Sequence, residues 1–477
     1  MKRVLVTGGA GFIGSHVVAL LLLQGCQVMS FDALLPQVHP QSPKWPDYQP
    51  DHENLAKYVG DVRDLNNSLM PAIREFQPDT IIHLAAMVGV GQSNYQAAAY
   101  TSANITGTMA LLHAVADWNE QVLIAQERKA ALENLIGREP CHEDGSPISD
   151  EEKEHIQREL NAELENTKPG TFIDQVFVAG SMSSYGEGMR DHNGTPVPTD
   201  ELWPLNPASI YAWTKAQQEE GALLLNSLRP GILNVKIGRF FNAYGRNQAL
   251  TNPYTGVAAI FSASLLSGVA PVIYGDGSQT RDFIHVSDVA DGILAIVERG
   301  DGERGDGEIY NIGTGIPTSV LMLATLLARE IHGDAKGDPI APNVTNLIRS
   351  GDILHCYADS RKLQALGWEP KVSLEDGVKD LIQWVREQPA QQKESMLYRA
   401  HEELMRYNLL RPAMPEAPPP DDMGAPDMPK APAPKDEDFI TVVSDIQING
   451  FNHVVNHVVV DPDELGADTT IVVKDAS

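Results

Sequence analysis

A tyrosine and a lysine four residues apart are the residues of this chain best suited to acid–base chemistry. They are Tyr211 and Lys215 in the run Tyr-Ala-Trp-Thr-Lys, and the serine-rich turn Gly-Ser-Met-Ser-Ser-Tyr-Gly lies upstream at 180–186. A free phenol has a pKa near ~10 and is a poor base at neutral pH. A lysine charge at ~5 Å, with an effective dielectric constant of ~20, favours the phenolate by roughly 3 kcal/mol, or about two pKa units. The pair therefore predicts a tyrosine base that handles a hydroxyl proton.

A glycine-rich turn at the start of the chain is the second chemical signal. Gly8, Gly11 and Gly14 lie between a strand-like run and a helix-like run, and Asp32 ends the next strand-like run. Residues without a Cβ let a pyrophosphate approach the amides of a helix N-terminus. A carboxylate at the second strand end accepts hydrogen bonds from both ribose hydroxyls and repels a 2′-phosphate, which favours NAD over NADP. A base beside NAD indicates redox chemistry at a carbinol carbon.

Each signal also has an ordinary structural explanation. The tyrosine–lysine pair could be a contact between neighbours on a helix surface, and the carboxylate could be a solvated loop residue. Three neighbours favour the chemical interpretation: Ser181 in the turn after the fifth strand-like run, Asn104 on the preceding helix, and the Asn-Pro stop at 206–207. The residues that this pattern predicts to bind NAD are Gly8, Gly11, Gly14, Asp32, Asp61, Val62, Leu84, Ala85 and Ala86.

Composition places the chain among ordinary globular proteins. Its 477 residues are 42% hydrophobic, which allows two domains and a sizeable core. The formal net charge of −28 argues against general binding to nucleic acid or anionic membranes. The three cysteines, Cys26, Cys141 and Cys356, are too widely spaced to suggest a disulfide framework or a thiolate metal site. The chain starts directly with a strand-like run, and the apolar stretch 16–23 is too short to span a bilayer, so we expect a soluble cytoplasmic protein without membrane insertion.

Strand-like and helix-like runs alternate through the first half of the chain. The strand-like runs lie at 3–7, 27–31, 56–60, 79–84, 175–179 and 233–238. This alternation implies right-handed crossovers and a parallel sheet. The predicted fold class is α/β, with a Rossmann-like doubly wound parallel sheet. We expect an NAD-binding domain at 1–250 and a smaller, interleaved α/β substrate-binding domain mainly at 251–395.

Three further segments do not fit this minimal pattern. Residues 119–171 are rich in Glu, Gln, Lys and Ala and predict two amphipathic helices inserted into the first domain. Residues 411–437 predict a Pro-rich acidic linker, and the β-branched residues of 438–477 predict a small β unit. His453 and His457 are four apart there, but on a strand this spacing does not make a metal-binding face. No metal site is predicted.

Together these residues resemble the extended short-chain dehydrogenase/reductase family, in its NAD-dependent epimerase/dehydratase branch. The resemblance runs from residue 1 to about residue 389, apart from the helical insertion. The motifs that carry it are those at 7–14, 60–64, 83–86, 181–186, 239–245 and 281–288, with Asn104, Tyr211 and Lys215. The resemblance implies that Ser181 hydrogen-bonds the reacting hydroxyl, that Tyr211 takes its proton, and that Lys215 also holds the nicotinamide ribose. It adds Phe12, Ile13, Asn104, Tyr211 and Lys215 to the residues expected to bind NAD.

The residues after the catalytic serine distinguish reactions within the family. Sugar-nucleotide 4,6-dehydratases that resemble this chain carry Asp-Glu there, whereas this chain has Met182 and Ser183, which cannot act as that acid and base. The glutamate of a decarboxylase and the cysteine of a 3,5-epimerase are missing as well. What remains is oxidation at C4, rotation of the 4-ketose, and return of hydride to its opposite face. By elimination, the resemblance implies a nucleotide-sugar 4-epimerase.

The second half of the chain carries most of the expected substrate residues. The runs 247–261, 275–277 and 349–355 resemble the dTDP-L-rhamnose 4-epimerase branch of the family. Arginine suits a diphosphate because its donors are bidentate, although the arginine at 281 could instead be a structural partner of a neighbouring aspartate. The expected substrate-binding residues are Ser93, Ser183, Asn242, Arg281 and Arg349, of which Ser93 faces the sugar and the last three hold the diphosphate.

Two alternatives remain open. A UDP-hexose 4-epimerase of the UDP-glucose type would use the same residues, and a non-catalytic nucleotide-binding scaffold could keep the same fold. The intact Ser181, Tyr211 and Lys215 argue against the scaffold, because a binding protein does not need an activated phenol. The resemblance also implies a homodimer, with the helical insertion and the C-terminal extension as candidates for further assembly contacts.

Overall fold

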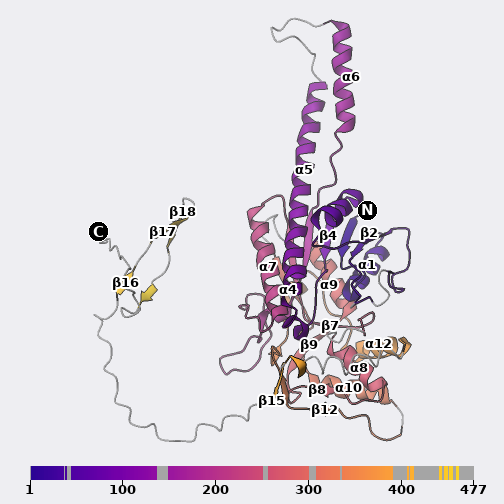
Figure 1. Cartoon of the computed structure of the whole chain (residues 1–477), viewed down its shortest axis with the longest axis vertical. Coiled ribbons are helices and arrows are strands. Elements are labelled where there is room, and N and C mark those ends of the chain that lie inside the picture. The colour runs from indigo at the N-terminus through magenta and orange to yellow at the C-terminus, as the bar shows by residue number, and fades with distance from the viewer. Residues whose placement is uncertain are drawn as a thin grey trace. The chain divides into compact units, whose positions relative to one another are not determined.

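The computed structural model of the chain contains two compact units, Met1–Ala413 and Met414–Ser477 (Figure 1). It describes residues 2–36, 38–39, 44–136, 149–250, 256–299, 308–333, 336–389, 405–407, 409–412, 440–442, 445–448, 451–454 and 458–460. Most of the predicted linker at 411–437 lies outside the described residues. Its first two residues do not, and they belong to the first unit.

A seven-stranded parallel sheet forms the centre of the first unit. Its strand order is β10-β6-β5-β4-β1-β2-β3, and each neighbouring pair is parallel. The chain winds outward in both directions from β1, which confirms the predicted doubly wound fold. The strands are β1 (Arg3–Thr7), β2 (Gln27–Asp32), β3 (Leu55–Val59), β4 (Thr80–His83), β5 (Gln175–Ser181), β6 (Val235–Phe240) and β10 (Glu308–Ile312). Six of them match the predicted strand-like runs, and β10 returns from the second half of the sequence.

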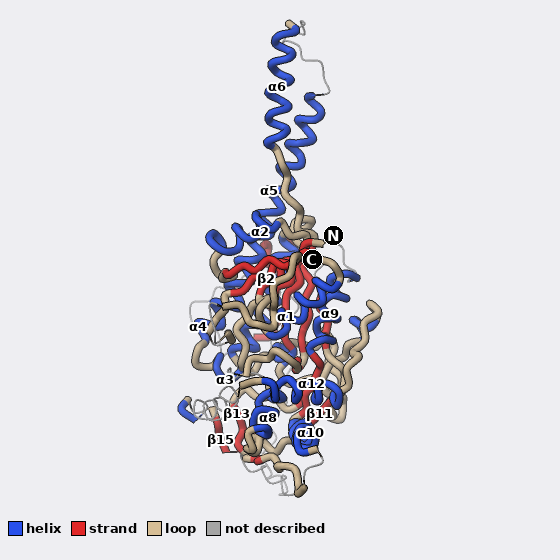
Figure 2. The backbone as a smooth tube through the Cα atoms, turned by 90° about the vertical axis from the view of Figure 1, so that its right-hand side faces the viewer, coloured by secondary structure: helices blue, strands red, loops and turns tan. Residues whose placement is uncertain are grey.

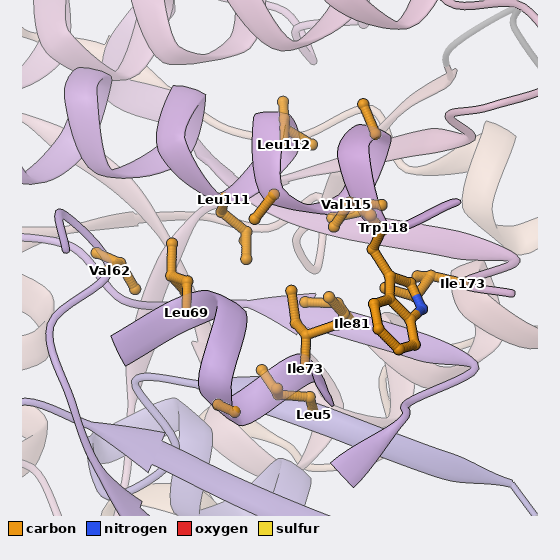
Figure 3. Close-up of a cluster of buried hydrophobic side chains, with 14 of the residues drawn as sticks. Leu5, Val62, Leu69, Ile73, Ile81, Leu111, Leu112, Val115, Trp118 and Ile173 are labelled. Atoms are coloured by element: carbon orange, nitrogen blue, oxygen red, sulfur yellow. The ribbon is translucent and has the colours of Figure 1, made fainter. Parts of the chain in front are cut away.

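Successive side chains of β1 point to opposite faces of the sheet and enter two separate apolar cores. Leu5 joins the core shared with α2, α5 and α7, whereas Val4 and Val6 join the core shared with α1 and α9. Figure 3 shows the first of these cores, in which Ile73 of α2 and Leu111 of α5 pack over the sheet. The covering helices are α1 (Phe12–Leu23), α2 (Met70–Phe76), α5 (Gly107–Ile136), α7 (Ile210–Leu228) and α9 (Val286–Arg299).

The helical insertion is a hairpin of the outer part of α5 and α6 (Asp150–Asn166), which extend side by side away from the sheet (Figures 1 and 2). It begins later than residue 119. Asn119 is fully buried, and its amide nitrogen donates to the carbonyls of Ile173 at 3.0 Å and Ile232 at 2.8 Å. Val122 is also buried in the core. Because this stretch has a polar composition, the sequence did not show that one turn of α5 belongs to the core and holds β5 in place. The boundary predicted at residue 119 was wrong for that reason.

A second, smaller α/β layer is interleaved with the sheet in sequence. The chain enters this layer after β6, and β10 then returns to complete the parallel sheet. Its strands form a four-stranded group around β9 and two short pairs, β8 with β12 and β13 with β15. The helices α8, α10 and α12 share one apolar core beside it. The elements of this layer are β7 (Asn242–Tyr244), α8 (Val257–Leu266), β8 (Val272–Ile273), β9 (Thr280–His285), β11 (Pro317–Ser319), α10 (Val320–His332), β12 (Asn343–Val344), β13 (Leu347–Arg349), β14 (His355–Cys356), α12 (Leu374–Glu387) and β15 (Leu410–Pro412).

Short helical segments connect these elements. They are a π-helical turn at Leu65–Leu69, α3 (Val90–Ser93), α4 (Ala97–Tyr100), a π-helical turn at Thr101–Thr106, a 3-10 turn at Met182–Tyr185, and α11 (Arg361–Gln364). Throughout the described part of the chain, no helix has the length and apolar character needed to cross a membrane. Cys26 and Cys356 are buried free thiols, and Cys141 lies outside the described residues.

The described residues of the second unit form four short strands in two antiparallel pairs. β16 (Ile440–Val442) pairs with β19 (Val458–Val460), and β17 (Asp445–Ile448) pairs with β18 (Phe451–Val454). The β-branched pattern of the extension therefore does indicate strands. His453 lies in β18, while His457 lies outside the described residues. Among the residues that the structure describes, no cluster of side chains could hold a metal ion.

Candidate active site

A cavity of about 510 Å³ lies at the carboxyl ends of β1, β2, β4, β5 and β6 and is closed by α7, β9 and the turn after β13. This is the edge at which doubly wound sheets bind ligands. Among the sequence-predicted residues, Ser93 and Asn104 do not line the cavity. Those that do are Gly8, Gly11, Phe12, Ile13, Gly14, Asp32, Asp61, Val62, Leu84, Ala85, Ala86, Ser181, Ser183, Tyr211, Lys215, Asn242, Arg281 and Arg349.

The glycine-rich turn needs residues without side chains. Gly8 has a φ of +69°, and a Cβ there would lie 2.7 Å from the amide nitrogen of Ala85. A Cβ on Gly14 would lie 2.1 Å from the carbonyl oxygen of Gly8. The turn can therefore pass close to β4 and start α1 directly at the cavity, where a helix N-terminus suits a phosphate group.

The carboxylate of Asp32 lies at the adenosine end expected for the cofactor. It accepts hydrogen bonds from the amides of Ala10 at 3.1 Å and Leu34 at 2.8 Å, and it is 9% exposed. Burial raises the pKa of Asp32, against the lowering effect of nearby His39, whose Nε2 is 3.7 Å from Oδ1. His39 also lines the cavity. It was not predicted, because the segment after β2 has no periodic signal.

Two further residues of this segment hold the glycine-rich turn. The Tyr48 hydroxyl donates to the carbonyl of Ala10 at 2.7 Å, and the Gln49 amide donates to the carbonyl of Gly9 at 3.0 Å. Ser30 of β2 in turn donates to Gln49 at 3.1 Å. The turn is thus fixed from outside by side chains that a motif search on glycine spacing does not find.

The first turn of α7 is capped by three side chains. Its amides at Ile210, Tyr211 and Ala212 donate to the side chains of Asn94, Ser93 and Ser209, at 3.3, 2.9 and 3.2 Å. The Ser93 hydroxyl also donates to the carbonyl of Val90 at 2.7 Å, and the residue is fully buried. Ser93 was expected to face the sugar, but its side chain does not line the cavity. Its hydroxyl instead bonds the carbonyl of Val90 and the amide of Tyr211, and so caps the helix that carries Tyr211.

Asn104 has a similar supporting position. Its Oδ1 accepts the amide of Met87 at 2.8 Å, and its Nδ2 donates to the carbonyl of Met87 at 3.1 Å and to the Thr214 hydroxyl at 3.0 Å. It is fully buried. Asn104 thus joins the cavity-lining loop after β4 to Thr214, near the start of α7, and is not among the cavity-lining residues.

Ser181, Tyr211 and Lys215 come together at the centre of the cavity. The Ser181 hydroxyl lies 2.7 Å from that of Ser183 and is hydrogen-bonded to Tyr211. The Lys215 ammonium donates to the carbonyl of Ala179 at 2.8 Å and to the side chain of Gln218 at 2.9 Å. A hydroxyl, a phenol and a cation thus share one wall, as the sequence predicted.

The electrostatics of the pair differ from the sequence-based expectation. Burial raises the pKa of Tyr211, and the hydrogen bond with Ser181 lowers it only in part. Burial also lowers the pKa of Lys215 to about 7, although the charge of Glu219 raises it. The expectation that Lys215 draws the pKa of Tyr211 down was therefore wrong for the protein alone. The reason is that desolvation acts on both side chains, and the ammonium is directed at main-chain oxygen.

Two arginines and a shared aspartate form the other end of the cavity. Arg281 and Arg349 each donate to Asp352 Oδ1, at 3.2 and 3.0 Å, and all three residues line the cavity. Burial alone would raise the pKa of Asp352, but the two guanidinium groups outweigh it and hold that pKa below its usual value. The group keeps an excess of one positive charge, which suits a diphosphate.

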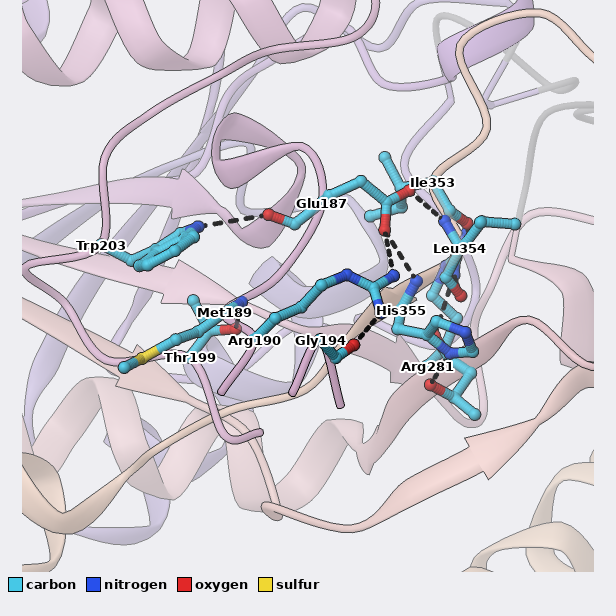
Figure 4. Close-up of polar contacts among 11 residues, drawn as sticks. Glu187, Met189, Arg190, Gly194, Thr199, Trp203, Arg281, Ile353, Leu354 and His355 are labelled. Atoms are coloured by element: carbon cyan, nitrogen blue, oxygen red, sulfur yellow. Dashed lines mark hydrogen bonds and ion pairs between the residues drawn. The ribbon is translucent and has the colours of Figure 1, made fainter. Parts of the chain in front are cut away.

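Arg281 is fixed by the backbone of the segment before β14. It donates to the carbonyls of Ile353 at 2.6 Å and Leu354 at 3.2 Å. Glu187 holds the same segment, because its carboxylate accepts the amides of Leu354 and His355 (Figure 4). The aspartates beside Arg281 in sequence do not pair with it. Instead, Asp352 does, and sequence reasoning found neither that residue nor Glu187.

Three buried polar atoms of the cavity lining have no hydrogen-bond partner among the described residues. They are Oδ1 of Asn242, Oε1 of Gln248 and Nε of Arg349. Buried polar atoms are nearly always paired, so unpaired ones in a cavity wall indicate a polar ligand. Gln248 lies in the run 247–261 but was not singled out from the sequence.

Comparison with known proteins agrees with this geometry. Residues 4–313 match the model of the NAD dependent epimerase/dehydratase family. The chain belongs to this family. The dTDP-L-rhamnose 4-epimerase of Burkholderia thailandensis is 32% identical over 395 residues, covering 81% of this chain and 96% of that protein. A putative UDP-glucose 4-epimerase of Methanocaldococcus jannaschii is 29% identical and covers 80% and 98% of the two chains.

Solved structures show the same architecture. The UDP-glucose 4-epimerase of Thermus thermophilus in complex with NAD has a TM-score of 0.57 and 25% identity, and covers 81% of this chain and 100% of that one. As a member of this family, the protein is an NAD-dependent enzyme of the nucleotide-sugar 4-epimerase/dehydratase class. The cofactor fits the site, because a side-chain-free turn at a helix N-terminus and the Asp32 carboxylate line the same cavity.

Proposed function

We propose that the protein is a nucleotide-sugar 4-epimerase and that dTDP-L-rhamnose is its substrate. The observation that carries the proposal is the distribution of acids in the cavity. Asp32, Asp61 and Asp352 are the only carboxylates among its described lining residues, and each has a partner. Asp61 pairs with Arg63, whose Nε is 2.9 Å from Oδ1, and Asp352 pairs with two arginines. None of these described carboxylates is placed beside Tyr211 to eliminate water.

Met182 and Ser183 occupy the places where a dehydratase would need an acid and a base. Both line the cavity, and Met182 is 7% exposed. A thioether cannot transfer a proton, and the Ser183 hydroxyl is hydrogen-bonded to Ser181. Ser181 and Tyr211 can therefore exchange one proton with one substrate hydroxyl, and no second acid–base pair is available from Met182 and Ser183. Epimerisation through a ketone requires only that one exchange.

The proposed mechanism assigns one task to each of the three central residues. Ser181 hydrogen-bonds the C4 hydroxyl of the sugar, and Tyr211 takes its proton as the carbon is oxidised. NAD, when bound, would supply the hydride acceptor. Lys215 fixes α7 against β5 through its bond to the carbonyl of Ala179, which holds Tyr211 beside Ser181. After the 4-ketose has rotated in the site, C4 regains the hydride on its opposite face and Tyr211 returns the proton to the same oxygen, so that neither a proton nor a hydride is gained or lost overall.

Support for the thymidine substrate comes from sequence similarity. The runs 247–261, 275–277 and 349–355 resemble the dTDP-L-rhamnose 4-epimerase branch, and the relative of that name is 32% identical over 81% of this chain. A UDP-hexose of the UDP-glucose type is the second candidate, since UDP-glucose 4-epimerases are also among the relatives. In either case we assign Asn242, Arg281 and Arg349 to the diphosphate.

The deciding experiment is incubation of the full-length protein with dTDP- and UDP-sugars in deuterated water, followed by NMR. The proposal predicts inversion at C4 with no solvent deuterium at C3 or C5, and a higher kcat/KM for dTDP-L-rhamnose than for UDP-glucose. Deuterium at those carbons, or formation of a 4-keto-6-deoxy product, would contradict the epimerase. Binding of nucleotides without any conversion would favour the scaffold.

We further infer that the enzyme is a homodimer. The supporting observation is a row of exposed apolar side chains on α7, with Trp213 at 41%, Leu224 at 61% and Leu228 at 66% exposure.

The outer part of the α5–α6 hairpin, which is remote from the cavity, is assigned to contacts instead of catalysis. Replacing residues 125–166 by a short loop is expected to leave turnover unchanged. A folded variant without activity would refute that assignment.

A further inference from the structure

The C-terminal end of the first unit returns to the substrate side of the cavity. β15 pairs in antiparallel fashion with β13, with Leu410 opposite Arg349 (Figure 2). Next to this pair, the amide of Ser350 donates to the carbonyl of Leu409 at 2.8 Å. Residues 405–407 and 409–412, here called the strap, therefore add a strand to the element that carries a cavity arginine. The match to the family model ends at residue 313, well before the strap.

The strap also contacts the loop that caps the catalytic helix. The ring of Tyr407 stacks on that of Tyr95, with centroids 4.1 Å apart and an angle of 10° between the planes. Tyr95 directly follows Ser93 and Asn94, whose side chains accept the first amides of α7. One end of the strap is thus attached to the loop whose side chains cap the helix that carries Tyr211.

The two elements joined by the strap also approach each other at the cavity. Gly351, which follows β13 and has a φ of +82°, lies against the start of α7. A Cβ on this glycine would be 3.0 Å from the carbonyl oxygen of Ala208 and 3.6 Å from Val90. Because Gly351, Ala208 and Val90 all line the cavity, the distance between Arg349 and the Tyr211 helix depends on this contact. The strap supports it from outside.

We propose that the strap sets the position of Arg349 relative to α7 and that Tyr407 is a positioning residue for the diphosphate of the substrate. The inference rests on the proposed function, since it takes a nucleoside diphosphate as the ligand. A three-residue strand pair is weak by itself, because an isolated two-stranded ladder is marginal in water. The aromatic stack provides a second attachment, which fixes the end of the strap that the ladder does not.

Full-length variants loaded with NAD test this proposal. Tyr407→Ala removes the stack, Tyr407→Phe keeps it, and Met405→Ala is the matched control, since Met405 lies on the same segment and is 54% exposed. Calorimetric titration with dTDP and with UDP should show the dissociation constant rising about three- to tenfold in Tyr407→Ala. The other two variants should stay within about twofold of the wild type, and NAD content should be equal in all.

Hydrogen exchange gives a second measurement that needs no nucleotide. In Tyr407→Ala the amide of Ser350 should exchange faster, while amides of β9 should not change. Unchanged nucleotide affinity, unchanged exchange at Ser350, or an equal loss of NAD and thermal stability would each overturn the proposal. A wild type that binds dTDP but converts no nucleotide sugar would refute the epimerase and leave the role of the strap standing.

Discussion

The ammonium of Lys215 lies 2.8 Å from the carbonyl oxygen of Ala179, two residues before Ser181 on β5. This bond joins α7 to the strand that carries the serine, and so fixes Tyr211 against Ser181. Lys215 is 3% exposed, and the second acceptor of its ammonium is Gln218 on its own helix. The lysine therefore has a geometric task, because the alignment of Ser181 with Tyr211 depends on this bond.

Removal of the phenol is expected to abolish most of the turnover. Tyr211→Phe should lower kcat by about 10²–10⁴-fold, because a positioned base contributes rate by that factor. NAD content should not change, since the ring remains in the cavity wall. The rate of C4 inversion, followed by NMR, is the measurement. Tyr357→Phe is the control, because that phenol donates to Pro196 away from the cavity. A Tyr211→Phe enzyme with more than a tenth of wild-type kcat would exclude the tyrosine as the base.

The arginine opposite the catalytic centre should act on binding instead of chemistry. Arg349→Ala is expected to raise KM by about 10–100-fold with little change in kcat, since hydrogen bonds to charged groups contribute roughly 1.5–3 kcal/mol. Arg349→Lys should recover only part of the loss, because lysine lacks the planar fork. Arg190→Ala serves as control, since Arg190 pairs with Glu187 at 3.6 Å and does not line the cavity. An equal fall in kcat for Arg349→Ala would contradict this assignment.

The sequence was sufficient for the fold and for the centre of the site, but not for its supports. Gly8, Asp32 and Tyr211 follow local rules, because turn geometry, strand ends and helix spacing depend on nearby residues. Ser93 and Asn104, which were expected at the ligands, do not line the cavity, and the reason is the opposite one. Their partners, Tyr211 and Thr214, are more than a hundred residues away, so only the folded chain shows that both side chains support α7.

Long-range pairing also explains the residues that were missed. Asp352 joins two arginines from β9 and β13, and Tyr48 contacts the glycine-rich turn from a loop without periodicity. The boundary at residue 119 failed because Asn119 is a polar residue in a polar stretch, yet it is fully buried. Composition measures average polarity and cannot identify one amide that bonds two main-chain carbonyls.

A buried ion pair under the catalytic helix should make a large contribution to stability. Arg239 Nε lies 2.9 Å from Glu219 of α7, and both side chains are 3% exposed. Glu219→Gln leaves the guanidinium buried without a counter-charge, so a loss of about 3–5 kcal/mol in the free energy of unfolding is expected. Denaturant titration measures it. The exposed pair of Lys44 and Asp47 is the control, and Asp47→Asn should cost less than about 1 kcal/mol. Equal losses in both variants would contradict the prediction.

The histidine at the end of β4 should make the fold sensitive to acid. His83 is fully buried between the hydroxyls of Thr7 at 2.7 Å and Thr108 at 2.9 Å. Burial, assisted by the charge of Lys215, lowers its pKa from 6.5 to about 3. Below pH 6.5 the unfolded chain binds a proton that the folded chain refuses, so this stability is present above that pH and is lost as the pH falls toward 3.

The expected slope from this group is about 1.4 kcal/mol per pH unit between the two pKa values. His83→Gln cannot titrate, so its unfolding free energy should fall less steeply with acid than that of the wild type. The exposed His192 provides the control, since His192→Gln should keep the wild-type slope. Denaturant unfolding at several pH values between about 4 and 7 gives the comparison. Identical slopes in His83→Gln and the wild type would show that another group is responsible.

Removal of the second unit should leave catalysis intact if the cut respects the strap. A chain that ends at Ala413 keeps the whole first unit and every residue of the cavity lining, so kcat, KM and NAD content should match the full-length protein. A cut at Arg411 would divide β15 and expose the edge of β13. The matched chain that ends at Leu404 lacks the strap, and its KM should rise while its NAD content stays the same.

Mass measurement in solution on the chain that ends at Ala413 separates assembly from catalysis. A smaller oligomer with unchanged kcat would assign assembly to the extension, whereas loss of turnover in the chain ending at Ala413 would refute its independence from the active site.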